Sequence, residues 1–135
     1  NNTLKVADLA TGAAVTTGNR PVVAGPDGQL RIGELNTVNA IRTETTNYTA
    51  LASDETILVN ATSGTVVITL PAASSAIGKK YTVKKVDASG NNVNVISAGG
   101  TIDGNAAATG IAGSLPWQGW VFQSDGTNWY IISRI

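Results

Sequence analysis

The sequence predicts an all-β protein, and three observations lead to this fold class. Thr, Val, Ala, Asn and Gly are abundant, whereas charged residues make up only 13% of the 135 residues, against an average of about 25%. Short segments of alternating apolar and polar residues are separated by turn-forming sequences, which is typical of strands and hairpins. No segment carries the 3.6-residue period that an amphipathic helix would show.

Two turn sequences predict hairpins at the two ends of the chain. Pro26-Asp27-Gly28 combines a Pro, which presets φ at the first corner, with a Gly, which accepts positive φ. The flanking segments 22–24 and 30–32 alternate as paired strands do. Asp125-Gly126 lies between two alternating segments and is a strong hairpin signal as well. Pro21 lacks a backbone N–H and suits the start of a strand.

A run of short strands is expected through the second half of the chain. The expected strands are 55–61, 65–70, 79–86, 93–96, 101–103, 120–123 and 128–132. Val86 is out of phase with Tyr81 and Val83 within one of these strands. We therefore expect a β-bulge near Lys84-Lys85, since one extra residue shifts the alternation.

The first 47 residues contain no aromatic side chain; Tyr48 is the first in the chain. Residues 1–47 can bury only small and aliphatic side chains, which offset little of the chain entropy. They either pack on the second half or on other copies of the same chain, and copies are favoured. We expect a β-rich stalk or spacer at 1–47 and a separate domain at 48–135.

Composition excludes several classes of protein. Nine basic residues balance nine acidic ones, which argues against binding to duplex nucleic acid. The chain has no Cys and no His, so disulfides, zinc fingers, thiol catalysis and histidine-based triads are excluded. No apolar run approaches the roughly 20 residues needed to insert into a bilayer. Met is absent, including an initiator, as expected for a processed piece of a longer chain.

Acidic residues offer little for catalysis. Asp54 and Glu55 are adjacent on a predicted strand, so they point to opposite faces and cannot form a facing carboxylate pair. Three further aspartates precede Gly in turn sequences, where local hydrogen bonds account for them. They are Asp27, Asp103 and Asp125. The segment 87–92 carries oxygen ligands without EF-hand spacing, so a turn is favoured over a calcium site. We expect no enzyme, no metal and no cofactor.

One cluster of lysines stands out. Lys79, Lys80, Lys84 and Lys85 share a short predicted strand. They indicate either docking to an acidic surface, such as an anionic bacterial polysaccharide, or an edge strand whose charges prevent aggregation. The edge strand is the favoured interpretation.

The tryptophans supply the candidate ligand contacts. Trp129 and Phe122 are expected in the core of the last hairpin. Trp117 and Trp120 follow a Gly/Ala-rich segment, and an exposed indole stacks well on a sugar ring or a partner side chain. At three residues apart on an extended chain they face opposite sides, so at most one is a platform. Trp117, Gln118 and Trp120 are the candidate contact residues, with core or interface packing as the favoured alternative.

Several segments together resemble a C-terminal domain common in bacteriophage tail-fibre and related tail proteins. They occur in the familiar order and span the second half of the chain. The segments are 48–59, 67–73, 78–87, 101–104 and 123–130. The pattern at 18–30 is similar to a spacer unit of tail-fibre and adhesin stalks.

The resemblance implies a β-sandwich-like, jelly-roll-like head that assembles as a homotrimer at a fibre tip, without catalysis. It implies an extracellular location in the virion tail. The implied partners are a bacterial cell-surface glycan or outer-membrane receptor and the upstream part of the same fibre protein. The segments 99–113 and 115–119 depart most from the pattern, and such loops are where recognition usually resides.

Our leading hypothesis is a tail-fibre tip domain that attaches to a bacterial receptor, with a glycan as the expected ligand. One alternative is a purely structural virion module for decoration, needle or fibre assembly, which would bind no cells. Another is a bacterial adhesin or carbohydrate-binding module that folds as a monomer. An enzyme is the remotest of these hypotheses.

Overall fold

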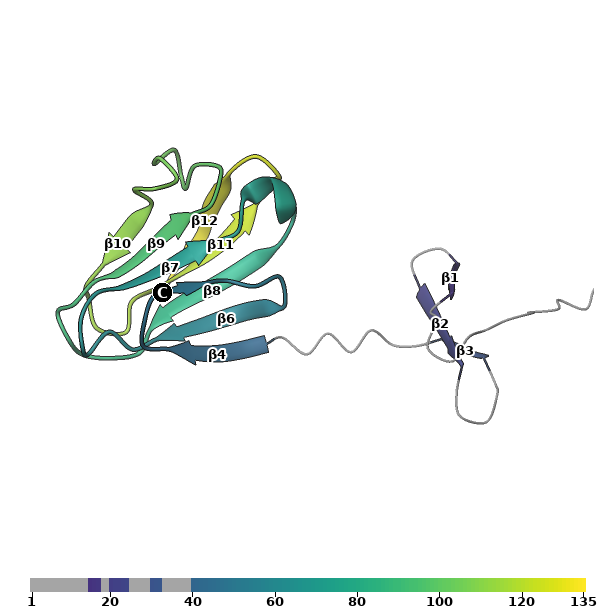
Figure 1. Ribbon diagram of the computed structural model, residues 1–135, viewed down its shortest axis with the longest axis horizontal. Helices are drawn as coiled ribbons and strands as arrows, with labels where there is room; N and C mark the ends of the chain where they lie inside the picture. Colours follow the sequence, from purple (N-terminus) through teal and green to yellow (C-terminus); the bar gives the residue numbers. More distant parts are fainter. Residues whose placement is uncertain (1–14, 18–19, 25–29, 33–39) are drawn as a thin grey trace, which may run out of the picture. The chain divides into compact units, whose positions relative to one another are not determined.

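The computed structural model describes residues 15–17, 20–24, 30–32 and 40–135 (Figure 1). The chain divides into two compact units, Asn1–Val38 and Asn39–Ile135, so the division falls earlier than the expected one after residue 47. The described strands of the first unit are β1 (Val15–Thr17), β2 (Arg20–Ala24) and β3 (Leu30–Ile32).

These three strands form an antiparallel sheet in the order β1-β2-β3. The pairing of β2 with β3 confirms the hairpin expected around Pro26-Asp27-Gly28. The turn itself lies outside the described residues.

The second unit consists of two mixed sheets, which confirms the all-β fold class. One sheet has the order β10-β9-β7-β5 and the other β12-β11-β8-β6-β4. The strands are β4 (Ala40–Glu44), β5 (Tyr48–Thr49), β6 (Asp54–Val59), β7 (Val66–Leu70), β8 (Lys80–Lys85), β9 (Val93–Ser97), β10 (Ile111–Gly113), β11 (Gly119–Ser124) and β12 (Trp129–Arg134). A single 3-10 turn, η1 (Ala73–Ser75), is the one helical element of the described residues. That part of the chain holds no helix long and apolar enough to cross a membrane.

The strands β4 to β9 pass alternately from one sheet to the other and pair in parallel. β6 lies between β4 and β8 in the five-stranded sheet, and β7 lies between β5 and β9 in the four-stranded sheet. The chain thus repeats a unit of two consecutive strands, one in each sheet, and we call each such unit (β4–β5, β6–β7 and β8–β9) a coil. Equivalent residues of successive coils pair with each other, as Ile57 does with Val83 and Ile68 does with Val95. Jelly rolls are built from antiparallel strands, so the jelly-roll detail of the prediction is not shown.

Antiparallel strands complete both sheets. β10 pairs with β9, and the hairpin β11–β12 adds to β8, which confirms the hairpin expected at Asp125-Gly126. The register shifts lie between Val121 and Phe122 and between Ala40 and Ile41. The pairing of β8 is regular through Lys84 and Lys85, so the bulge expected there is wrong. β8 pairs with β6 on one side and β11 on the other. The prediction of a lysine-rich edge strand is therefore also wrong.

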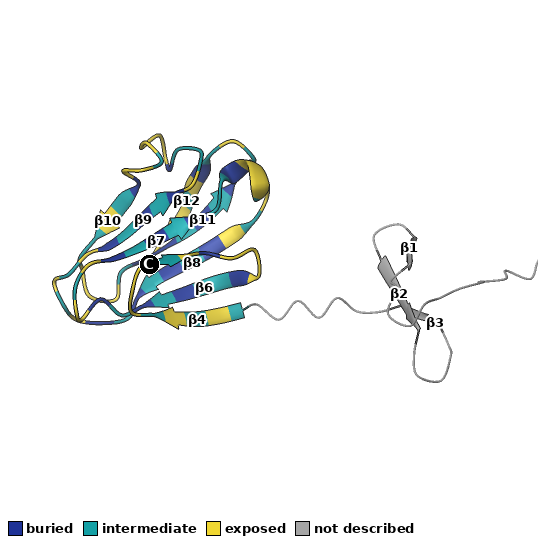
Figure 2. Cartoon of the chain, in the orientation of Figure 1, coloured by how far each residue is buried: buried dark blue, intermediate teal, exposed yellow. Residues whose placement is uncertain are grey.

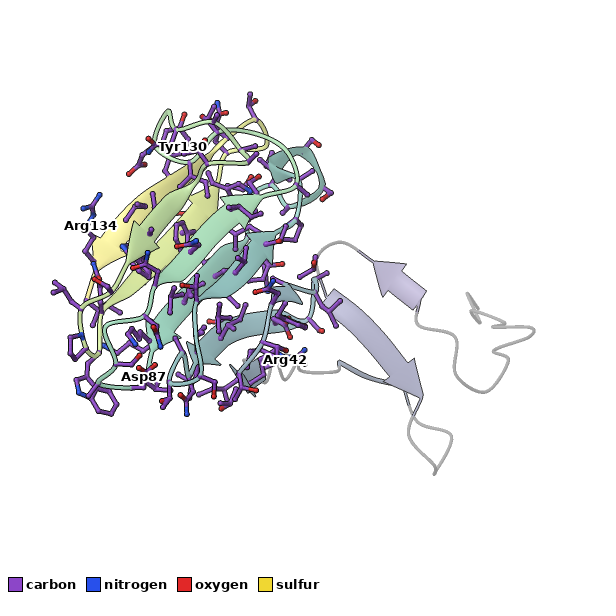
Figure 3. All side chains as sticks on the ribbon, turned by 60° about the vertical axis from the view of Figure 1, so that its left-hand side comes forward. Arg42, Asp87, Tyr130 and Arg134 are labelled. Atoms are coloured by element: carbon purple, nitrogen blue, oxygen red, sulfur yellow. The ribbon has the colours of Figure 1, made fainter. Side chains whose placement is uncertain are left out.

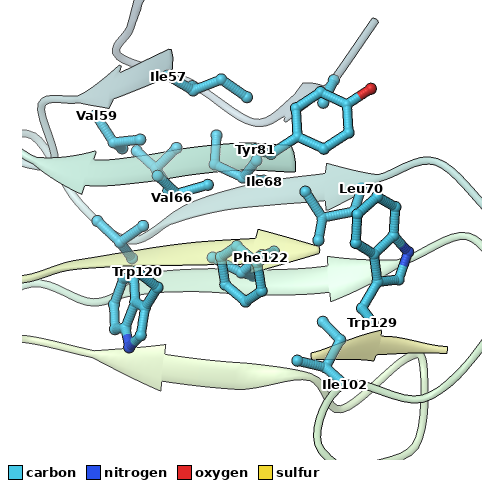
Figure 4. Close-up of a cluster of buried hydrophobic side chains, with 14 of the residues drawn as sticks. Ile57, Val59, Val66, Ile68, Leu70, Tyr81, Ile102, Trp120, Phe122 and Trp129 are labelled. Atoms are coloured by element: carbon cyan, nitrogen blue, oxygen red, sulfur yellow. The ribbon is translucent and has the colours of Figure 1, made fainter. Parts of the chain in front are cut away.

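Buried and less buried residues alternate along the strands (Figure 2), so every second side chain faces the space between the sheets. The largest apolar side chains of this core include Trp120, Phe122 and Trp129 (Figure 4). The rings of Tyr81 and Trp129 lie 5.6 Å apart in a tilted arrangement. The indole N–H of Trp129 donates to Pro71 O at 3.0 Å, so the buried polar atom has a partner. The expectation that Phe122 and Trp129 belong to the core is confirmed.

The topology collects the loops at two ends of the second unit. The carboxyl ends of the parallel strands β4, β6 and β8 meet at one end. We call this the Trp117 end, formed by residues 45–47, 60–65, 86–92 and 114–118. The opposite end, where β6 and β8 begin, is formed by residues 50–53, 71–79, 98–110 and 125–128, and we call it the groove end.

Candidate functional site

Trp117 is the exposed tryptophan of the described residues. It lies in the loop between β10 and β11 and is 57% exposed, in contrast to the buried Trp120 and Trp129. The loop is tied by a hydrogen bond from Gln118 N to Leu115 O at 3.3 Å. The Lys84 ammonium donates to Trp117 O, and this fixes the loop to the end of β8.

The backbone of Trp117 adopts a left-handed conformation. Its φ is +61°, and Asp103, at +47°, is the other non-glycine residue with positive φ in the described part of the chain. Asp103 has a structural reason for this conformation, because its Oδ1 accepts a hydrogen bond from Ile131 N at 3.0 Å. Trp117 has no comparable local compensation through its side chain. A left-handed L-residue costs about 1–2 kcal/mol, and strain of this kind collects at functional sites.

Gln118 and Trp120 support the loop between β10 and β11 through a hydrogen bond and through packing. The Gln118 side chain is half-buried, and its Oε1 accepts from Leu115 N at 3.3 Å. Gly113 leaves no room for a Cβ beside the Gln118 amide and the Trp120 ring. Trp120 is only 2% exposed, so its indole offers no face to a ligand. Of the three candidate contact residues, Trp117 alone is exposed to solvent.

A buried ion pair lies at the same end, in the segment that follows β8 (Figure 3). Lys85 is fully buried, and its ammonium pairs with Asp87 Oδ1. Asp87 also accepts from Ala61 N at 2.7 Å and Ser89 N at 2.8 Å. Burial alone would raise the pKa of Asp87, but Lys85, Ser89 and these N–H donors together hold it well below the usual carboxyl range.

This network gives the segment 87–92 a structural role. Donors of the protein occupy both oxygens of the Asp87 carboxylate, as the turn interpretation expects. Nowhere in the described ranges do three or more His, Cys, Asp or Glu side chains gather as metal ligands would. The Asp87 oxygen that binds Ala61 N connects neighbouring coils of the sandwich.

The lysines of β8 consequently do not act as one cluster. Lys85 points into the core, Lys84 bonds to the Trp117 loop, and Lys80 is exposed. The Lys79 ammonium lies 5.2 Å from the centre of the Tyr81 ring at the opposite end of the strand. Lys80 and Lys84 share the outer face of β8, whereas Lys85 is on the buried face, so the four lysines do not form a single basic surface.

A second polar network joins β4, β5 and β6. Tyr48 OH donates to Asp54 Oδ2 at 2.7 Å, and the Arg42 guanidinium lies 4.0 Å above the Tyr48 ring. Arg42 also pairs with Glu44 at 2.6 Å. Burial and the bond to Asp54 raise the pKa of Tyr48 to about 12, so its hydroxyl is a poor base or nucleophile near neutral pH. Asp54 is buried and Glu55 is half-buried at the start of β6, where the pairing with β4 shifts register between Ala40 and Ile41.

A polar trough of about 460 Å³ also opens at the Trp117 end. It is lined by Thr45, Thr46, Asn47, Ser63, Gly64 and Thr65. Hydroxyl and amide groups of this kind hydrogen-bond sugar hydroxyls. Sequence analysis did not single out these residues, because Thr, Ser and Asn in turns have an ordinary local explanation.

No protein-family model matches the chain, and no curated protein matches it significantly. The geometry of the site is therefore the basis for the function proposed below.

Replacing each tryptophan with Ala separates the core residue from the platform. Trp120→Ala removes a buried indole, and we expect it to lower the free energy of unfolding by about 3–5 kcal/mol. Trp117→Ala keeps the same backbone strain and leaves little cavity, so we expect a change within about 0.5 kcal/mol. Denaturant unfolding followed by circular dichroism measures both. Equal losses in the two variants would contradict the assignment.

Substitutions at the buried ion pair test its structural role. Asp87→Ala leaves the Lys85 ammonium buried without its carboxylate, and we expect a loss of about 3–5 kcal/mol. The double variant Lys85→Val with Asp87→Ala copies Val59 and Ala61 of the preceding coil. We expect it to be about 2 kcal/mol more stable than Asp87→Ala alone, in the same unfolding measurement. If the double variant loses as much free energy of unfolding as Lys85→Val and Asp87→Ala lose together, the two residues are not coupled.

The Asp87 carboxylate also predicts a pH dependence. Because the folded state lowers its pKa, its contribution to stability is fully present above the ordinary carboxyl pKa of about 3.9. That contribution is lost as the pH falls from about 4 toward the lowered pKa. The free energy of unfolding is measured between about pH 2 and 7, which is the range of carboxyl titration. It should decrease more steeply with falling pH for the wild type than for the double variant.

Proposed function

We propose that this protein is a non-enzymatic tip domain of a bacteriophage tail fibre, and that it attaches the virion to a glycan on the bacterial surface. The observation that carries the proposal is Trp117, a large aromatic side chain held in solvent on a left-handed backbone. An indole face stacks on the apolar face of a sugar ring. The resemblance of the segments across 48–135 to phage tail proteins supports this choice over other glycan-binding classes.

The loop that carries Trp117 is suited to binding because it is already ordered. Its hydrogen bonds run to Leu115 and Lys84, so little conformational entropy remains to be lost when a ligand binds. The polar trough at 45–47 and 63–65 lies at the same end of the unit. The trough lies beside β4, β5 and β7, whereas the Trp117 loop joins β10 to β11 toward the other side of the two sheets. A neutral sugar chain that stacks on Trp117 and bonds to the trough therefore has to extend across this end of the unit.

A homotrimer is the second part of the proposal. The first unit spans only 38 residues, and units below about 40 residues usually need oligomerisation or another support to fold. The edge strand β12 exposes Tyr130 and Ile132, which provides apolar surface for a subunit contact. Three weak glycan sites on one tip would gain avidity through multivalency.

A purely structural virion module is the second candidate, and one observation favours it. Leu115, Ile132 and Ile135 are more than half exposed, and apolar surface of this kind serves protein contacts as well as ligands. Such a module would assemble with another virion protein and bind no cells. A monomeric adhesin or carbohydrate-binding module remains the third alternative.

Variants of Trp117 test the glycan platform. We expect Trp117→Ala to weaken binding of the labelled protein to a responsive bacterial strain or glycan on an array by at least about tenfold, as for a stacking hot spot. Trp117→Phe keeps an aromatic face and should retain part of the binding. Trp117→Gly relieves the strain at positive φ and should be at least as stable as Trp117→Ala while binding no better. Undiminished binding by Trp117→Ala would overturn the proposed platform.

The assembly state is tested by light scattering coupled to size exclusion. We expect about 41 kDa, three times the 13.8 kDa of the chain, as symmetric assembly predicts. A species of 13.8 kDa at micromolar concentration would instead favour the monomeric adhesin or carbohydrate-binding module.

A further inference from the structure

A second concave site lies at the groove end, where β8 begins. Its volume is about 510 Å³, and its lining is mainly apolar. Its lining includes Leu51 and Ile77, which are 54% and 76% exposed, and we call them the Leu51 wall and the Ile77 wall. Ala50, Pro71 and the buried ring of Tyr81 contribute to its lining. Large aliphatic side chains this exposed around a concave surface indicate a binding site.

The Leu51 wall is held in place by three hydrogen bonds. Leu51 O accepts from Tyr81 OH at 2.9 Å and from Asp54 N at 3.0 Å. Leu51 N donates to Asp54 Oδ2 at 2.8 Å. The exposure of Leu51 therefore belongs to an ordered turn.

The Ile77 wall is anchored to the last hairpin. A Cβ at Gly126 would lie 3.1 Å from Ile77 Cδ1, so the side chain rests directly on this glycine. Gly78 N donates to Ser124 O at 2.9 Å, and Ser124 N donates to Lys79 O at 3.1 Å. Both walls are thus fixed in the absence of a ligand, which lowers the entropy lost on binding.

Lys79 gives the groove a positive charge. Its ammonium is held 5.2 Å from the centre of the Tyr81 ring, a distance typical of cation–π pairs. The ion pairs within the described ranges involve Arg42 and Lys85, and none of them involves Lys79. The groove therefore offers a cation without a carboxylate partner beside apolar walls, and an anion with an apolar substituent complements it.

The strand beside the groove argues for a compact ligand. Extended peptides commonly bind by adding a strand to a free sheet edge. Both edges of β8 are paired, with β6 and β11. Turns and η1 form the remaining lining. A single ring with short substituents matches this enclosure better than an extended chain does.

We propose that this groove binds an acidic sugar residue that carries an acetyl or similar methyl-bearing group. The carboxylate pairs with Lys79, and the methyl group packs between Leu51 and Ile77. The choice of a sugar rests on the proposed function, whereas the need for an anion with an apolar group rests on the groove alone. The site lies at the opposite end of β8 from Trp117, so the two sites are separable by substitution.

The test is an NMR titration of the ¹⁵N-labelled 135-residue chain with three sugars. N-acetylneuraminic acid carries both the carboxylate and the acetyl group, N-acetylglucosamine carries only the acetyl group, and glucuronic acid carries only the carboxylate. We expect N-acetylneuraminic acid to shift the amides of 50–52 and 76–81 and to bind several-fold more tightly than the other two sugars. Equal or absent shifts at these amides for all three would overturn the proposal.

Two lysine variants provide the matched comparison. Lys79→Gln removes the groove cation, and we expect threefold to fivefold weaker binding of N-acetylneuraminic acid, as for a partly exposed ion pair. Lys80→Gln removes the adjacent charge, which lies outside the groove lining, and should bind as the wild type does. Equal weakening by both variants would overturn the site, because it would show only a general effect of charge.

Further arms separate this inference from the proposed function. Trp117→Ala should leave the shifts at 50–52 and 76–81 unchanged, and their loss would contradict an independent groove. Tighter binding of a short acetylated acidic peptide than of N-acetylneuraminic acid would overturn the assignment to a sugar. Loss of cell binding in Trp117→Ala with an intact groove would confirm the platform separately from the groove.

Discussion

The parallel pairing of β4, β6 and β8 is the constraint on which the rest of the second unit depends. A parallel pair cannot be joined by a tight turn, so the chain has to return through a longer crossover connection. Here it returns through β5 and β7 in the opposite sheet. Every connection between β4 and β9 must therefore cross one of two ends. The trough lies at one end for this reason, and Leu51 and Lys79 lie at the other. The Trp117 loop reaches the end that holds the trough through β10, which runs antiparallel to β9.

The buried pair of Lys85 and Asp87 stands out against the repeated coils. At the corresponding positions of the preceding coil, Val59 and Ala61 fill the core without any charge. The Asp87 carboxylate of the ion pair accepts a hydrogen bond from Ala61 N in the neighbouring coil. The geometry of this bond depends on the register between β6 and β8. Buried ion pairs contribute less to stability than well-packed apolar groups, and register specificity is among their best-supported roles. In a stack of similar parallel strands, a slip by one residue would exchange core and surface positions.

Local features of the fold could be predicted from the sequence. Alternation located β7, β9 and the last hairpin, because a half-buried strand imposes a period of two. The parallel pairing was not predicted, since strand propensity does not distinguish parallel from antiparallel neighbours. A signal did exist: Ser63-Gly64 and Ser89-Gly90 occupy equivalent turns of successive coils, and a search for internal repeats would have found it.

Part of the candidate site could be predicted from local sequence, and part of it depended on tertiary contacts. The expectation that at most one of Trp117 and Trp120 is a platform followed from strand geometry, but the choice between them did not. It depends on the left-handed backbone at Trp117 and on the space that Gly113 leaves for Trp120. Lys85 was misassigned for a related reason. A lysine in a sequence indicates solvent, and only the tertiary pairing with Asp87 allows its burial.

The first strand of the second unit begins at the groove end. β4 begins with Ala40 at the groove end, because it runs parallel to β6 and β8. The chain therefore enters the unit at the groove end, and the Trp117 loop lies at the far end from this entry. The glycan contact that we propose for Trp117 is thus at the end of the unit opposite the start of β4, where the exposed indole is carried on a left-handed backbone.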